Sequence, residues 1–137
     1  MPPERWPPDD PREWLNRARG NLPRAKTVLP EFYLEDLCFD AQQAAEKAIE
    51  AVLIARGVDF PLVHDLERLL NLLGESGESI PPDVADAKDL TRFAAAARYP
   101  GVTEPVTAEE HRRAVAIAEA VVAWAEGRVG KGQSGAK

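Results

Sequence analysis

The sequence predicts an all-α protein, an up-and-down antiparallel bundle of about five helices. Apolar residues recur with helical spacing in every long segment, and no stretch combines strand-like alternation with β-branched residues. Proline, glycine and capping residues divide this pattern into units joined mostly by short connections, which favours antiparallel neighbours. The 137 residues have the length of one domain. We therefore predict a disordered N-terminus at 1–9, a helical bundle at 10–127 and a disordered basic tail at 128–137.

The first helix is predicted to begin after Asp10, because an aspartate N-cap followed by Pro11 in the first turn is a typical helix start. Glu13, three residues after the cap, completes the pattern. The helix runs to about Leu29, and Pro23 within it predicts a kink, because proline lacks the backbone donor that the preceding turn requires.

The second helix is predicted from about Glu31 to Arg56. Its small residues cluster on one arc of the helical wheel, where they allow a close helix neighbour: Ala41, Ala44, Ala45, Ala48, Ala51 and Ala55. The opposite face is expected to be wet and carries Asp36, Asp40, Gln43, Lys47 and Glu50. Phe39 and Ile54 interrupt it, which predicts a second buried contact, in a homodimer or with another helix of the chain. Gln42 borders the apolar arc and fits a buried polar network, whereas Glu46 is expected to be solvated.

The remaining helices are shorter or later in the chain. The third, within "HDLERLLNLLG", ends at Gly74, and the fourth is predicted from Pro81 to Arg98. The fifth begins with a Thr-x-x-Glu capping box at Thr107 and ends at Gly127.

Composition excludes several classes of protein. The net charge is −6, and residues 127–137 carry three positive charges and no negative one, so the rest of the chain is more acidic still. This balance argues against duplex DNA as a ligand, because such binding depends on neutralising many phosphates. The apolar runs are too short for a membrane span and the N-terminus does not resemble a signal peptide, so we expect a cytoplasmic protein. Cys38, the single cysteine, lies on an apolar stripe and is expected to be a small buried hydrophobe. The sequence offers no metal site and no cofactor motif.

The connection "AARYPGVTEPVTAEEH", residues 96–111, joins the last two helices and carries the candidate functional residues. Alternating helix direction would place several polar residues at one end of the bundle. The spacing of Arg98 and of His111 relative to apolar residues on their helices turns both side chains inward. The predicted group is Arg56, His64, Asp65, Arg98, Tyr99 and His111.

Structural roles are open for the same residues. Arg98 suits a helix C-terminus, where the dipole favours a cation. His111 in the first helical turn fits a partly buried spacer, and His64 with Asp65 fits a cap of the third helix.

The sequence resembles the HEPN family, in the runs "CFDAQQAAEKAIEAVLIARG" (38–57), "HDLERLL" (64–70) and "ARYP" (97–100), which occur in that order. The resemblance covers roughly residues 12–126. It implies a homodimeric five-helix bundle, often encoded beside a minimal nucleotidyltransferase and acting with it as a toxin–antitoxin or related nucleotide-handling module. Many family members are metal-independent ribonucleases with an arginine, four to six intervening residues and then a histidine. Arg98 matches the arginine, but the residues at the histidine positions are Thr103, Glu104 and Pro105.

Two main functions follow. In the first, Arg98, Tyr99, His64 and Asp65 bind a nucleotide or RNA phosphate, since the planar guanidinium suits phosphate oxygens and a tyrosine can stack on a base. In the second, the protein is a ribonuclease toxin in which His111 transfers protons and Arg98 stabilises charge on the phosphate. A purely structural dimerisation bundle is the third alternative. We favour the binding module, because the Arg–His spacing departs from the ribonuclease pattern.

Overall fold

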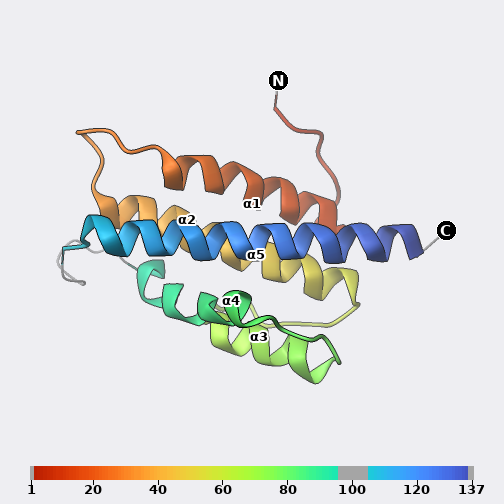
Figure 1. Ribbon diagram of the computed structural model, residues 1–137. Helices are drawn as coiled ribbons and strands as arrows, with labels where there is room; N and C mark the ends of the chain where they lie inside the picture. Colours follow the sequence, from red (N-terminus) through yellow and green to blue (C-terminus); the bar gives the residue numbers. More distant parts are fainter. Residues whose placement is uncertain (1, 96–104, 136–137) are drawn as a thin grey trace.

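The computed structural model describes residues 2–95 and 105–135, and all the regular elements among them are helices (Figure 1). The predicted all-α bundle is confirmed. The elements are α1 (Pro11–Lys26), α2 (Leu34–Ala55), α3 (Leu66–Glu75), α4 (Pro82–Ala85), the 3₁₀ helix η1 (Asp86–Ala94) and α5 (Ala108–Gly135).

α1 begins as the sequence predicts and ends earlier. The Asp10 carboxylate accepts a hydrogen bond from the backbone N–H of Arg12 at 2.9 Å, which makes Asp10 the N-cap. Pro23 lies inside the helix, close to its C-terminal end at Lys26. The hydroxyl of Thr27 donates to the carbonyl of Pro23 at 2.7 Å, so the last turn of α1 gains a partner in the following residue.

α2 is the central element of the bundle, because α1, α3, η1 and α5 all pack against it. The predicted alanine arc is confirmed for Ala41, Ala44, Ala45, Ala48 and Ala51, which are fully buried, whereas Ala55 is exposed. Cys38 is also fully buried, as predicted. Small side chains let two long helices approach the α2 backbone closely, which explains how α1 and α5 both fit against it.

The predicted fourth helix differs in kind, because only Pro82–Ala85 is α-helical and the chain continues as the 3₁₀ helix η1. Its three buried side chains, Ala87, Leu90 and Phe93, are spaced three residues apart. A 3₁₀ helix has three residues per turn, so this conformation puts all three on one face.

The direction of α3 departs from simple alternation. The C-cap of α2, Arg56, donates from its guanidinium to the hydroxyl of Ser76 at 2.9 Å and to the carbonyl of Ser76 at 2.6 Å, and Ser76 is the C-cap of α3. The two helices therefore end side by side and run in the same direction, and residues 57–65 lead back along α2 (Figure 1). As a consequence α5 runs antiparallel to α1, as its pairs Lys26–Glu119 and Arg19–Glu126 confirm.

The segment before α1 contacts the bundle, and the segment after Gly127 continues α5. The N-terminal segment, residues 2–10, contacts α1: the indole of Trp14 donates to the carbonyl of Pro8 at 2.7 Å, and the backbone N–H of Trp6 donates to Glu13 at 2.8 Å. α5 continues through Gly127, its predicted end, as far as Gly135, so the predicted end of this helix is wrong.

Candidate functional site

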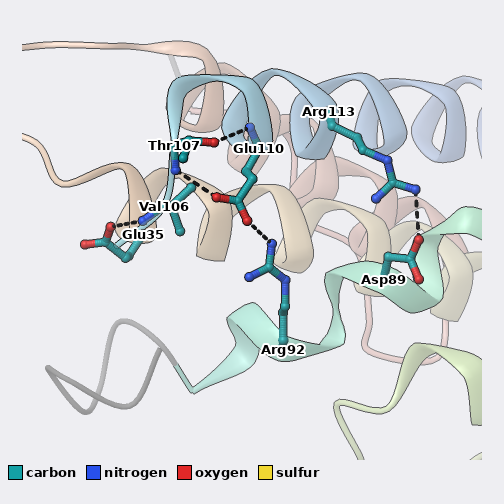
Figure 2. Close-up of polar contacts among 7 residues, drawn as sticks. All are labelled: Glu35, Asp89, Arg92, Val106, Thr107, Glu110 and Arg113. Carbon is teal, nitrogen blue, oxygen red and sulfur yellow. Dashed lines mark hydrogen bonds and ion pairs between the residues drawn. The ribbon is translucent and has the colours of Figure 1, made fainter. Parts of the chain in front are cut away.

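Residues 96–104, which include Arg98 and Tyr99, lie outside the described residues, but the chain on both sides of them is firmly anchored (Figure 2). The capping box of α5 forms as predicted: Glu110 accepts from the backbone N–H of Thr107 at 3.0 Å, and the Thr107 hydroxyl accepts from the N–H of Glu110 at 3.1 Å. Arg92 of η1 donates to the other oxygen of Glu110 at 2.9 Å. The end of η1 and the start of α5 are therefore joined by an ion pair.

Two further contacts hold these anchors against the bundle (Figure 2). The backbone N–H of Val106 donates at 2.9 Å to Glu35 in the first turn of α2, and Arg113 of α5 donates at 2.8 Å to Asp89 of η1. Val106 therefore lies beside the N-terminal end of α2, and η1 is held against α5.

His111 has a structural partner. Its side chain is 7% exposed, and its Nε2 lies 2.7 Å from the carbonyl oxygen of Ala25 in the last turn of α1. A carbonyl can only accept, so Nε2 is the protonated nitrogen in this contact. The last carbonyls of a helix have no partner within it, and His111 satisfies one of them. His111 therefore connects α5 to the end of α1.

His64 lies in a different environment, at the start of α3. Its side chain is 54% exposed, and its Nδ1 lies 2.8 Å from Glu46 of α2, so the carboxylate fixes the orientation of the ring. The neighbouring Asp65 is the N-cap of α3, because its carboxylate accepts from the backbone N–H groups of Glu67 and Arg68. The predicted capping role of Asp65 is confirmed.

The two imidazoles do not share one hollow. Asn21 of α1 donates to Asp40 of α2 at 3.2 Å, which aligns the two helices. From that level Ala25, the partner of His111, lies toward one end of the bundle, and Glu46, the partner of His64, lies toward the other. At 1.5 Å of rise per residue the two partners are about 15 Å apart along the helix axes.

Arg56 is farther away still. It lies where α2 and α3 end, and there Glu78 accepts hydrogen bonds from both Arg56 and Arg128 at 2.8 Å. Because α3 runs parallel to α2, Arg56 at the end of α2 does not meet His64 and Asp65 at the start of α3.

A buried polar network on α2 was only partly predicted. Gln42 is fully buried, as the sequence allowed, and donates to Glu46 at 2.8 Å. Glu46 was expected to be solvated but is buried, because α3 begins over it and supplies His64 as its partner. Gln42, Glu46 and Glu50 are spaced four residues apart and form one stripe of α2. This four-residue spacing, next to the alanine arc, is the feature of the sequence from which a buried polar stripe could have been predicted.

Glu50 was predicted on the wet face and is 3% exposed, so this prediction is wrong. Its Oε1 is buried and has no hydrogen-bond partner in the described part of the chain. Burial raises the pKa of Glu50 to about 8, and the nearby Glu46 carboxylate adds to this effect. The carboxyl group is therefore mostly protonated at neutral pH.

Residues 2–95 and 105–135 show neither a cluster of metal ligands nor a helix suited to span a membrane. No three histidine, cysteine, aspartate or glutamate side chains there converge as metal ligands would. In the same residues, no helix combines the length and apolar character that crossing a bilayer demands.

Comparison with known proteins identifies the family. The HEPN domain model matches residues 11–128. The crystal structure of TT1696 from Thermus thermophilus is 33% identical to this chain with a TM-score of 0.74, and the match covers 86% of this chain and 97% of that one. The structure of ST0689, an archaeal HEPN homologue, is 25% identical with a TM-score of 0.70, and the match covers 88% and 98% of the two chains. A search of curated proteins gives no match. The chain belongs to the HEPN domain family.

Proposed function

We propose that this HEPN-domain protein is a binding module that holds an RNA or nucleotide phosphate and acts beside a minimal nucleotidyltransferase, as in toxin–antitoxin-type modules. Arg98 is the proposed phosphate ligand, Tyr99 stacks on a base, and His64 adds a polar contact. Asp65 contributes indirectly, by fixing the start of α3 next to His64.

The observation that carries this proposal is the contrast between the two histidines. His64 is half-exposed, and its Nδ1 is held by Glu46, so its Nε2 is the nitrogen that can meet a ligand. The backbone N–H of Leu66 donates to the hydroxyl of Thr91 at 3.1 Å, which ties the start of α3 to the 3₁₀ helix that leads toward Arg98.

The same contrast argues against His111 as the proton-transfer group of a ribonuclease. A general acid or base must reach the reacting hydroxyl within hydrogen-bond distance. The His111 ring is buried, and its Nε2 is bound to the Ala25 carbonyl. The ribonuclease alternative therefore lacks an accessible imidazole at the position that the sequence suggested.

The proposal is tested by binding of a short single-stranded RNA, measured by fluorescence anisotropy. Charge-assisted hydrogen bonds contribute roughly 1.5–3 kcal/mol, so Arg98→Ala should weaken binding about 10- to 100-fold. His64→Ala should weaken it less, by about 3- to 10-fold.

Arg112→Ala is the matched control, because Arg112 is exposed on α5 and pairs with its neighbour Glu109. Equal RNA affinity of Arg98→Ala and wild type, with circular dichroism showing both folded, would exclude the proposed site. Cleavage of the RNA by the wild-type protein would instead support the ribonuclease alternative.

A further inference from the structure

We propose that the N-terminal segment, α1 and α2 form a second binding site, which takes a nucleoside phosphate. Arg5, Arg17 and Lys47 hold the phosphate, and the indoles of Trp6 and Trp14 receive the base. This site is separate from the Arg98 region and does not depend on the function proposed above.

The site consists of two adjoining hollows. One has a volume of about 440 Å³ and is lined by Trp6, Pro8 and Trp14 together with charged residues. The other has a volume of about 380 Å³ and is lined largely by charged and polar residues, among them Arg24 and Asn21. They share four lining residues, Arg5, Glu13, Arg17 and Lys47. These volumes lie in the range of small-molecule sites, and an apolar part beside a charged part suits a ligand with a flat ring and an anionic group.

Positive charge is concentrated there although the protein carries a net charge of −6. Arg5, Arg17, Arg24 and Lys47 line the two hollows against two carboxylates, Glu4 and Glu13. Both oxygens of Glu13 are in use, since one accepts from the N–H of Trp6 and the other from Arg17 Nε, each at 2.8 Å. That second bond engages only Nε of Arg17, so its two terminal nitrogens can donate to a ligand.

Lys47 lies in the wall that the two hollows share. Its side chain is half-buried, and its ammonium donates to the neutral amide of Gln43 at 2.7 Å. Burial lowers the pKa of Lys47, because water no longer fully stabilises the charge. The nearby Glu46 carboxylate favours the charged form of Lys47 but does not offset the effect of burial, and Glu50, one turn further along α2, is mostly protonated at neutral pH. A phosphate group would add negative charge beside Lys47 through a charge-assisted hydrogen bond.

The indoles are held in place before any ligand arrives. Trp14 donates to the carbonyl of Pro8 and packs edge-on against Phe60, with 6.1 Å between ring centroids. The guanidinium of Arg12 lies 3.5 Å from the centre of the Trp6 ring. A wall of fixed aromatic side chains loses little entropy on binding, and stacking of a base contributes about 1–3 kcal/mol.

The test is a calorimetric titration of the full chain with adenosine monophosphate, adenosine and inorganic phosphate. Adenosine monophosphate should bind at least 10-fold more tightly than either of its parts, and it should quench tryptophan fluorescence. Lys47→Gln keeps a polar group beside Gln43 and should weaken adenosine monophosphate binding about 10-fold or more, and Arg17→Gln should do the same. Lys88→Gln, on an exposed position of η1, is the matched control.

Several outcomes would overturn the proposal. The first is that the wild-type protein does not bind adenosine monophosphate, and the second is that it binds inorganic phosphate with equal affinity. The third is that Lys47→Gln and Arg17→Gln, shown to be folded by circular dichroism, bind adenosine monophosphate as tightly as wild type. If Arg98→Ala abolishes binding of adenosine monophosphate whereas Lys47→Gln does not, the nucleotide belongs to the Arg98 region and this assignment is wrong. If Arg98→Ala weakens the binding of RNA but not that of adenosine monophosphate, the result concerns the Arg98 region and agrees with two separate sites.

Discussion

Glu50 couples a single proton to the stability of the whole bundle. Its pKa rises from 4.5 to about 8 on folding, because burial penalises the charged form. Between these values the folded state keeps a proton that the unfolded state has already lost. The free energy of unfolding contributed by this group therefore decreases as the pH rises from about 5 to about 8.

Replacing Glu50 by glutamine should remove this pH dependence. We expect the variant to match wild type near pH 5 and to exceed it at pH 9, by at most a few kcal/mol. Urea denaturation at several pH values measures the difference, and Asp36→Asn, an exposed carboxyl on the same helix, is the control. A constant difference between Glu50→Gln and wild type from pH 5 to pH 9 would contradict the coupling.

The surroundings of single side chains were the hardest feature to predict from the sequence. Local rules sufficed for Asp10, Asp65 and the Thr107–Glu110 box, because a cap depends on residues within four positions. The environments of Glu46 and His111 depend on α3 and α1, which contact them from 18 and 86 residues away. Helical periodicity within one element cannot reveal such a neighbour.

At the scale of helices, His111 is the polar tie between the start of α5 and the end of α1. Phenylalanine at this position would fill similar space and leave the Ala25 carbonyl without its partner. A buried acceptor left unsatisfied costs about 1–3 kcal/mol, so His111→Phe should lower the unfolding free energy by that amount.

Chemical denaturation measures the loss, and Arg112→Ala at the next, exposed position should change stability by less than about 0.5 kcal/mol. If His111→Phe is as stable as wild type, the imidazole is not a structural tie, and its availability for chemistry has to be reconsidered.

The positions of the helices followed from proline, glycine and cap signals, whereas the type of one helix and the direction of another did not. In the 3₁₀ helix η1 the three-residue repeat puts Ala87, Leu90 and Phe93 on one face toward the core. Their spacing also fits part of an α-helical stripe, so the sequence alone did not separate the two. The direction of α3 is seen from the contacts of Arg56 with Ser76, which join residues 20 positions apart and lie outside any local pattern.

For the molecule as a whole, we propose a homodimer that forms through the connection between α1 and α2. This connection exposes four apolar side chains within six residues: Val28, Leu29, Phe32 and Tyr33. Tyr33 is 73% exposed, and large apolar groups gathered on a surface are typical of protein contacts.

Sedimentation equilibrium should give twice the chain mass for wild type and a shift toward monomer for the double variant Phe32→Ser/Tyr33→Ser. Leu62→Ser is the control, because Leu62 is 90% exposed but lies apart from this connection. A monomeric wild type at micromolar concentration would contradict the dimer, and a dimeric double variant would place its interface elsewhere.

The central position of α2 also bears on how the protein is made. During translation α1 and α2 leave the ribosome before α5 and can pair at once, because they are neighbours in the chain. The alanine arc of α2 stays incompletely covered until α5, which begins only at Ala108, has emerged. Between the synthesis of α2 and that of α5 the nascent chain therefore presents a helical hairpin with an incompletely covered apolar face, and the bundle is complete only when α5 has formed.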